Sequence, residues 1–312
     1  MKFPVEILQK CWFLAGPTAV GKTALGIELA RRIDAEIISL DSMAIYREMD
    51  IGTAKPTADE LSQVPHHLID VVTPDQDFST AEYLHLAIAT CRDIIARSKV
   101  PLFVGGTGLY LRGVLRGVFE GPPADWGFRR EQESFAKAHG LASLHEQLRQ
   151  VDPVSAARIH PHDQRRVIRA LEIYHLTGEP ASKVQDETPL PQELRPNTVF
   201  WLAPDRDWLY TRIDQRVLRM IELGLVEEVD RLLKRTPAIS RTARQALGYR
   251  EIIDWRNGIF PSLSAAVTQI QTGSRQFAKR QHTWFRNLEE CRPVDVRPND
   301  SKQQIIQQML TR

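Results

Sequence analysis

The residues with the clearest chemical meaning form a glycine-bounded loop near the start of the chain. Eight consecutive residues match the pattern G-x-x-x-x-G-K-[ST]: Gly16, Pro17, Thr18, Ala19, Val20, Gly21, Lys22 and Thr23. Glycines let the backbone curl so that successive N–H groups point at one anion, and the following helix adds partial positive charge at its N-terminus. Lys22 can reach an outer phosphate, and the Thr23 hydroxyl can ligate Mg²⁺. The loop therefore predicts a polyphosphate site.

The loop does not say which polyphosphate binds. ATP, GTP and an organic diphosphate all present similar oxygens to it. No clear apolar run ends in Asp-Glu, which would be typical of a water-activating ATPase site. A kinase that phosphorylates a small metabolite or nucleotide remains open at this point.

Polar residues follow two further apolar runs. Asp41 ends the run 36–40, and Thr107 follows Gly105-Gly106 after the run 101–104. The carboxyl ends of strands are where open α/β sheets place their sites. The alternative is structural, because Asp and Thr also cap helices. The adjacent His66 and His67 would point to opposite faces of an extended strand, so we expect them to be structural or peripheral.

Two basic segments could contact nucleic acid. No acidic residue occurs between Trp255 and Leu288, and four basic residues there recur at three- and four-residue spacing on one predicted helix face: Arg275, Lys279, His282 and Arg286. The second segment is 165–169. A solvated surface is the alternative for both. Phe277 and Trp284 lie on another face, where we expect them to be core residues.

The elements that carry these residues alternate in type. Short apolar runs at 11–15, 36–40, 67–72, 101–105 and 198–203 predict strands, and helices are predicted at 23–33, 80–97, 207–234 and 264–287. From 129 to 176 the pattern is helical throughout, and 185–196 reads as a linker. We therefore expect an α/β fold, a P-loop NTPase-like parallel sheet formed by 1–117 and 196–312, with a helical insertion domain at 118–195.

Composition bounds the class of protein. The chain has 312 residues, 42% hydrophobic and 26% charged, with a formal net charge of +2. Such a balance neither indicates nor forbids a nucleic-acid partner. Three widely spaced cysteines, Cys11, Cys91 and Cys291, fit neither a disulfide framework nor a structural zinc site. No signal peptide or membrane span is visible, and a cytoplasmic protein is expected.

Seven further segments narrow the choice of function. They are Asp41–Tyr46, Asp50–Pro56, Pro65–Asp70, Gly105–Tyr110, Arg166–Glu172, Gly248–Arg250 and Lys279–Arg286. Together with the phosphate loop, in this order, they closely resemble the bacterial tRNA dimethylallyltransferases. The resemblance runs from about residue 12 to 287.

The resemblance implies a reaction and roles for several residues. Dimethylallyl diphosphate would give its five-carbon group to N6 of the adenine 3′ of the anticodon, with Mg²⁺ as cofactor and diphosphate as leaving group. The phosphate loop, 16–23, would hold the donor's diphosphate, with Arg216 as a further contact and Thr23 as the metal ligand. Asp41 would be the general base, and Thr107 would position the target nucleotide.

The partner implied by the resemblance is the tRNA anticodon stem-loop, bound by a cytoplasmic, monomeric enzyme without membrane attachment. Matching the family's tRNA contacts onto this chain gives Asp41, Ser42, Met43, Ala44, Thr107, Arg129, Arg165, Arg166, Val167, Ile168, Arg169, Gly248, Tyr249, Arg250, Lys279, Arg280, Gln281, His282, Thr283, Trp284, Phe285 and Arg286. The residues around Arg129, Trp126-Gly127-Phe128, depart from the commoner family pattern. A noncatalytic RNA-binding protein is a second alternative, which the presence of Lys22, Asp41 and Thr107 disfavours.

Overall fold

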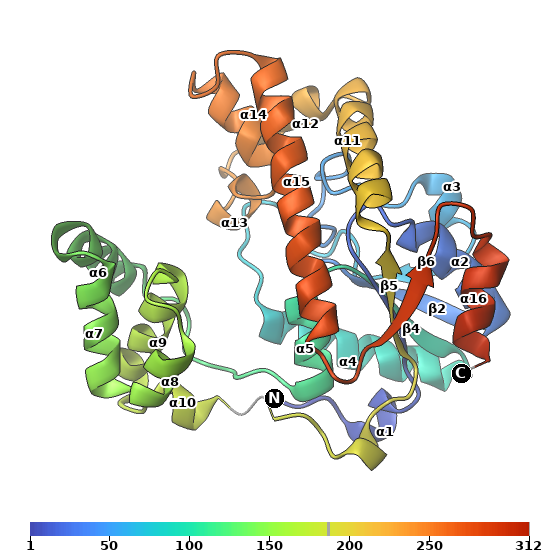
Figure 1. Ribbon diagram of the computed structural model, residues 1–312, viewed down its shortest axis with the longest axis horizontal. Coiled ribbons are helices and arrows are strands. Elements are labelled where there is room, and N and C mark those ends of the chain that lie inside the picture. The colour runs from blue at the N-terminus through green and yellow to red at the C-terminus, as the bar shows by residue number, and fades with distance from the viewer. Residues whose placement is uncertain (186–187, 312) are drawn as a thin grey trace. The chain divides into compact units, whose positions relative to one another are not determined.

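The computed structural model describes residues 1–185 and 188–311, which form two compact units. One unit comprises Phe3–Leu115 and Leu190–Arg312, and contains the sheet. The other comprises Met1–Lys2 and Arg116–Pro189. Figure 1 shows the helices and strands of both units. Residues 186 and 187, which fall in the predicted linker, lie outside the described residues.

A single parallel sheet of six strands forms the centre of the first unit. Its strand order is β3-β2-β4-β1-β5-β6. The strands are β1 (Trp12–Ala15), β2 (Ala35–Leu40), β3 (His66–His67), β4 (Val100–Gly105), β5 (Val199–Pro204) and β6 (Arg292–Val296). In register, Ala15 and Leu40 both pair with Gly105. Three strands therefore end together, and the loops that follow them meet at one edge of the sheet.

Helices on either side explain why the strands are apolar along their whole length. All six residues of β2 are buried, as expected for a parallel strand covered on both faces. One face is covered by α2 (Lys22–Arg32) and α16 (Lys302–Leu310), which contact each other (Figure 1). Leu25 and Leu29 of α2 share a core with Ile305 and Met309 of α16. Helix α4 (Thr80–Ala96) also packs on the sheet, with the short α1 (Val5–Leu8) beside it. The rings of Tyr83 in α4 and Tyr110 in α5 (Gly108–Arg116) stack at 3.9 Å.

A second core lies among the helices that follow β5. The elements are α11 (Arg206–Glu222), α12 (Leu225–Leu233), α13 (Arg241–Arg244), α14 (Tyr249–Arg256) and α15 (Leu263–Arg286), and α3 (Ala58–Leu61) belongs to the earlier loop region. Helices α11 and α15 run side by side (Figure 1). Tyr46 and Met49, from the loop after β2, pack among Val217, Tyr249 and Ile270 of these helices.

Two sequence predictions of secondary structure were wrong. The expected helix 207–234 is two helices, because Gly224 adopts a left-handed conformation, φ 98°, that ends the first and caps the second. The expected strand 67–72 is reduced to the two residues of β3. Leu68 and Asp70 have φ of 59° and 57°, which an extended strand does not allow.

The second unit is helical between residues 126 and 184. It contains α6 (Trp126–His139), α7 (Leu141–Val151), α8 (Pro153–Arg158), α9 (Gln164–Thr177) and α10 (Ala181–Val184). Its core includes Leu144, Leu148, Val167 and Ile173. Residues 190–195, placed in the insertion from sequence, group with the sheet unit and include the 3-10 turn η1 (Gln192–Leu194).

Candidate active site

The phosphate loop connects β1 to α2 and is shaped by two left-handed residues. Ala19 has φ 65° and Gly21 has φ 100°. Gly21 is the N-cap of α2, so the loop delivers its backbone directly to the N-terminus of that helix. A side chain at position 21 would strain this turn. The local geometry is that of an anion cradle.

Three polar side chains cluster at the loop. The Lys22 ammonium donates to the Pro17 carbonyl at 2.8 Å, and the Arg216 guanidinium of α11 donates to the Thr18 hydroxyl at 3.0 Å. The pKa of Lys22 is lowered to about 7, first by desolvation and then by the Arg216 charge, while the Asp41 carboxylate opposes both. Desolvation also lowers the pKa of Arg216, again opposed by Asp41. The positive charges of Lys22 and Arg216 repel each other in this desolvated place. A bound polyanion would offset that repulsion.

A second arginine of α11 was not predicted from the sequence. The Arg212 Nε donates to the Ala19 carbonyl at 2.8 Å, while its guanidinium lies over the Trp208 ring. Arg212 precedes Arg216 by four residues, which puts both on one helix face. The four-residue spacing from Arg216, which was predicted to contact the diphosphate, could have identified Arg212 from the sequence.

Asp41 and Thr107 lie on the neighbouring strand ends. One carboxylate oxygen of Asp41, Oδ1, accepts from the backbone N–H groups of Met43 at 2.8 Å and Ala44 at 3.3 Å. The capping alternative is thus realised at this one oxygen. The other oxygen, Oδ2, accepts no hydrogen bond from the described residues. Asp41 therefore keeps one oriented oxygen available for proton transfer.

Thr107 ties the loops that follow β2 and β4 to each other. Its hydroxyl accepts from the Ser42 N–H at 3.0 Å, and the Leu40 carbonyl accepts from the N–H groups of Gly106 and Thr107 at 3.1 and 3.0 Å. These bonds extend the pairing of β2 with β4 past the last strand residues. Asp41 and Thr107 consequently share a fixed framework.

One cavity of about 1040 Å³ joins these features within the sheet unit. Lys22, Thr23, Asp41, Thr107 and Arg216 all line it, as do 42–44 and 248–250. Its apolar lining includes Met43, Ile51, Ile69, Val217, Met220, Leu223 and Phe277. Cationic groups, a carboxylate and apolar side chains thus meet in one space.

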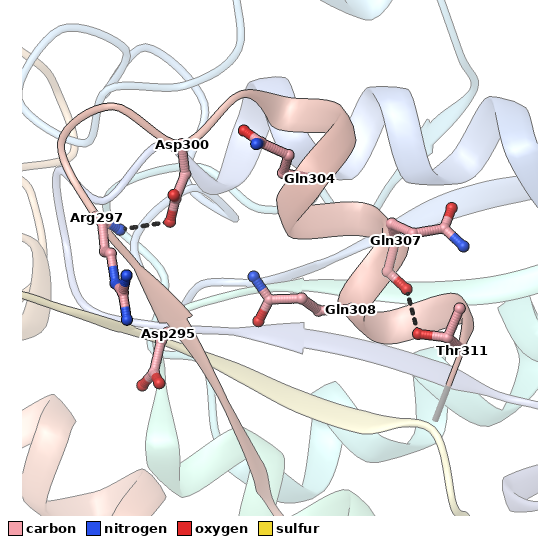
Figure 2. A pocket seen from close by; sticks show the side chains of 7 residues that line it. All are labelled: Asp295, Arg297, Asp300, Gln304, Gln307, Gln308 and Thr311. Carbon is pink, nitrogen blue, oxygen red and sulfur yellow. Dashed lines mark hydrogen bonds between the residues drawn. The ribbon is translucent and has the colours of Figure 1, made fainter.

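A smaller hollow of about 530 Å³ lies elsewhere, at β6, the turn after it and α16 (Figure 2). Figure 2 shows the Arg297 backbone N–H bonded to the Asp300 carboxylate, 2.8 Å away, and the Thr311 hydroxyl donating to the Gln307 carbonyl at 2.7 Å. Its lining is Asp295, Arg297, Asp300, Gln304, Gln307, Gln308 and Thr311. None of the residues predicted to be functional lies there.

Several residues predicted to contact tRNA have buried side chains. Val167 and Ile168 face the core of the helical unit, and Tyr249 and Phe285 are at most 1% exposed in the sheet unit. Gln281 is 4% exposed and points inward from α15. The sequence marks the segments, but only the packing decides which side chains of a helix face solvent.

In the helical unit the arginines divide into two groups. Arg165 and Arg166 are exposed. Arg129 and Arg169 instead pair with the fully buried Glu172: Arg129 donates through two nitrogens at 2.7 Å each, and Arg169 through one at 2.5 Å. Removing either arginine would leave a buried carboxylate less compensated.

On α15 and α14 the basic side chains also divide. Lys279, Arg280, Thr283 and Arg286 are exposed, and His282 and Trp284 are partly buried, His282 edge-on to Trp201. Arg275 pairs with Asp214 of α11 at 2.5 Å. Arg250 pairs with Glu251, and Gly248 has φ 93° as the N-cap of α14. The expectation that Phe277 is a core residue was wrong, since it is 37% exposed and lines the cavity.

A buried carboxylate on α12 holds the loop 50–52, another feature missed in the sequence. Glu228, 1% exposed, accepts from the N–H groups of Asp50 at 3.0 Å, of Ile51 at 2.9 Å and of Gly52 at 3.2 Å. It also accepts from the Tyr249 hydroxyl at 2.6 Å. The sequence places this acid at a core-facing position of an amphipathic helix. That position could have predicted its role, because a buried charge needs hydrogen-bonding partners.

Lys55, in the same loop region, also holds neighbouring backbone and side chains together. Lys55 donates to the Tyr46 carbonyl at 2.6 Å and to the carboxylates of Asp50 and Asp70 at 2.6 and 2.5 Å.

The two adjacent histidines make separate hydrogen bonds: His67 bonds the Glu36 carboxylate at 2.6 Å, and His66 bonds the Val64 carbonyl at 2.7 Å. No group of three or more His, Cys, Asp or Glu side chains within 1–185 and 188–311 could hold a metal ion.

Comparison with known proteins decides the family. The family model described as IPP transferase matches residues 44–288. The chain belongs to the IPP transferase family. It is 47% identical over 303 residues to a tRNA dimethylallyltransferase of Rhodopirellula baltica, with 94% of this chain and 90% of the relative covered. A second relative, the tRNA dimethylallyltransferase of Geobacillus thermodenitrificans, is 48% identical over 284 residues, covering 89% and 88%.

Solved structures agree with the family. The tRNA isopentenylpyrophosphate transferase of Bacillus halodurans is similar with a TM-score of 0.70 at 41% identity, covering 97% of this chain and 95% of that one. A eukaryotic dimethylallyltransferase acting on tRNA gives a TM-score of 0.72 at 28% identity, covering 92% and 74%. The P-loop NTPase-like sheet predicted from the sequence is thereby confirmed. Over the described ranges, no helix is both long and apolar enough to cross a membrane.

Proposed function

We propose that this protein transfers the dimethylallyl group of dimethylallyl diphosphate to N6 of the adenine 3′ of a tRNA anticodon, releasing diphosphate. The observation that carries the proposal is the single cavity in which a cationic phosphate loop faces Asp41 and Thr107. The names of the relatives, tRNA dimethylallyltransferases at 47% and 48% identity, support it.

The donor side accounts for departure of the leaving group. As the allylic carbon–oxygen bond breaks, negative charge builds on the diphosphate. The phosphate loop, Lys22 and Arg216 provide fixed positive charge and donors at that place. Preorganised stabilisation of developing charge is usually the largest catalytic contribution. Diphosphate would raise the lowered pKa of Lys22 and keep the ammonium protonated.

The apolar lining fits the other half of the donor. A dimethylallyl group needs a dry surface, since its allylic carbon carries positive charge in the transition state and would otherwise react with water. Val217, Met220 and Phe277 offer such a surface beside the phosphate loop.

Mg²⁺ is the cofactor of the proposed reaction. The ion commonly binds through one or two protein oxygens and the substrate's own phosphate oxygens, retaining several waters. The Thr23 hydroxyl in the cavity lining fits that donor set. When bound, the metal would supply Lewis-acid neutralisation of the leaving diphosphate.

Asp41 is proposed as the general base. The N6 amine is a weak nucleophile because its lone pair is delocalised into the ring, so its proton must leave as the new carbon–nitrogen bond forms. Oδ2 of Asp41 is the free oxygen, and two backbone N–H groups fix the carboxylate through Oδ1. Thr107 is proposed to hold the flipped adenine beside it, with Ser42, Met43 and Ala44 lining the approach.

The anticodon stem-loop is proposed to bind to exposed basic residues. These residues are Lys279, Arg280 and Arg286 on α15, and Arg165 and Arg166 on α9. Their charged groups can therefore reach RNA phosphates. The reaction as proposed requires one subunit and takes place in the cytoplasm, where its tRNA acceptor is found.

The decisive assay is mass spectrometry of nucleosides after incubation of unmodified tRNA with the protein, dimethylallyl diphosphate and Mg²⁺. A five-carbon gain on the adenosine 3′ of the anticodon is expected. The competing function, a small-molecule kinase, predicts instead that ATP binds the loop in preference to the prenyl donor. Titration with ATP and with a non-hydrolysable prenyl diphosphate analogue separates the two, and tight binding of ATP alone would overturn the proposal.

A further inference from the structure

A buried glutamine joins the two halves of the site. The Oε1 of Gln281 accepts from the Thr18 backbone N–H in the phosphate loop at 2.8 Å. Its Nε2 donates to the Gly106 carbonyl, next to Thr107, also at 2.8 Å. Both hydrogen-bonding ends of one 4%-exposed amide are therefore used, one on each loop.

These two bonds occur where the sheet no longer controls the loops. The last paired residues are Ala15 of β1 and Gly105 of β4. Beyond them, hydrogen bonds of Leu40, Ser42 and Thr107 still join the loop after β2 to the loop after β4. Between the phosphate loop and the loop after β4, Gln281 is the side chain that supplies hydrogen bonds among the described residues.

The packing of α15 shows that this contact is tight. A Cβ on Gly106 would come within 2.3 Å of the Gln281 Nε2. One helical turn further on, a Cβ on Gly108 would meet the Trp284 ring at 2.8 Å. Glycines at both positions allow α15 to press against the loop after β4, so the helix determines where that loop lies.

We propose that Gln281 is a positioning residue that sets the distance between the donor's diphosphate and the adenine acceptor. The inference rests on the proposed function above. In-line transfer requires the reacting carbon and nitrogen to be held near contact, and misplacement by about 1 Å can lower a rate about 10²-fold. Because Gln281 touches neither reacting group, its loss should lower the rate of transfer and leave both binding affinities nearly unchanged.

The test uses two substitutions that disturb the same contact from opposite sides. Gln281→Ala removes the amide, and Gly106→Ala displaces it by the added Cβ. Each is expected to lower the single-turnover rate at saturating substrates at least tenfold, with the Kd of the prenyl donor analogue and of tRNA within about threefold of the parent. The double variant should be no slower than Gln281→Ala, because the truncated side chain leaves room for the Cβ.

Controls separate positioning from folding and from the proposed function itself. Gln303→Met, on the exposed side of α16, tests a glutamine replacement away from the site and should keep the parent rate. Gln281→Met keeps the volume and serves if Gln281→Ala melts too low to assay. Losses that multiply in the double variant, parent-like rates, or weaker binding that accounts for the loss would overturn the inference. If the unsubstituted protein modifies no tRNA, both the proposed function and this inference are overturned. If the unsubstituted protein and the variants are all fully active, only this inference is overturned.

Discussion

Asp41→Asn separates the two roles that the structure gives to one carboxylate. Oδ1 accepts from the N–H groups of Met43 and Ala44, and an asparagine oxygen can replace it there. Oδ2 would become an NH₂ group, which cannot take a proton from the adenine. The substitution thus removes the base and keeps the turn.

The expected magnitudes differ sharply between stability and rate. Asn and Asp cap about equally, so exchange of the cap alone should change the free energy of unfolding by less than about 0.5 kcal/mol. Loss of the Asp41 charge beside Lys22 and Arg216 adds a destabilising contribution in the ligand-free protein. General base catalysis contributes about 10²–10⁴ in rate, which corresponds to about 2.7–5.4 kcal/mol of transition-state free energy. Asp41→Ala should lose the same rate and, in addition, about 0.5–2 kcal/mol of stability, because both oxygens are gone.

The assay is single-turnover prenyl transfer at saturating donor and tRNA, with denaturant unfolding of the same samples. The unfolding measurement, made without donor, should be run about one pH unit below the Lys22 pKa of about 7, because Asp41 raises that pKa and its removal favours the neutral lysine. Asp93→Asn, on α4, serves as a carboxylate control. A slow Asp41→Ala beside an Asp41→Asn within about threefold of the parent would refute the base and leave only the cap.

Three further expectations concern the donor site and tRNA. The folded-state pKa of Lys22, about 7, lies below its ordinary 10.5, so the unfolded chain binds more protons between these values and the free protein gains stability as pH rises through that window. Lys22→Met should therefore raise the melting temperature more at about pH 6 than at about pH 9, while abolishing protection by inorganic pyrophosphate; a variant that melts below the parent at acid pH contradicts this. Replacing Lys279 and Arg280 by Glu should weaken tRNA binding and reduce its salt slope by roughly 0.7–0.9 per lost phosphate contact, with donor binding unchanged; filter binding at two salt concentrations measures this, and an unaltered slope removes these side chains from the interface. Hydrogen exchange should slow across Arg165–Arg169 when tRNA is added, and the absence of protection there would exclude α9 as a contact.

Local patterns sufficed where chemistry or burial depends on neighbours in sequence. The phosphate loop, β1, β2 and β4 followed from a glycine motif and from apolar runs buried on both faces. The strand β6 was missed because only two of its five residues, Val294 and Val296, are buried and its partner β5 lies about 90 residues earlier. An edge strand of this kind is specified by its neighbour more than by its own composition.

The limits at the site have the same origin. Three site residues could be identified from the sequence, namely Asp41, Lys22 and Thr107. Each follows a strand or a glycine loop whose end can be recognised in the sequence. The inward orientation of Gln281 could not, because its exposed neighbours Lys279 and Arg280 obscure the helix face that packs on the loops. The burial of Tyr249 could not be predicted either, since its partner Glu228 is 21 residues away and only the fold brings them together.

The strand order has a consequence for synthesis of the chain on the ribosome. β1 lies between β4 and β5, so one of its edges has no partner until residue 199 has emerged. The amide clamp on the phosphate loop comes later still, 263 residues after Thr18. A nascent chain therefore makes its glycine loop early but completes the cavity late. Polypeptides released before α15 is translated would lack Gln281 and would have no side chain bridging the phosphate loop to the loop after β4.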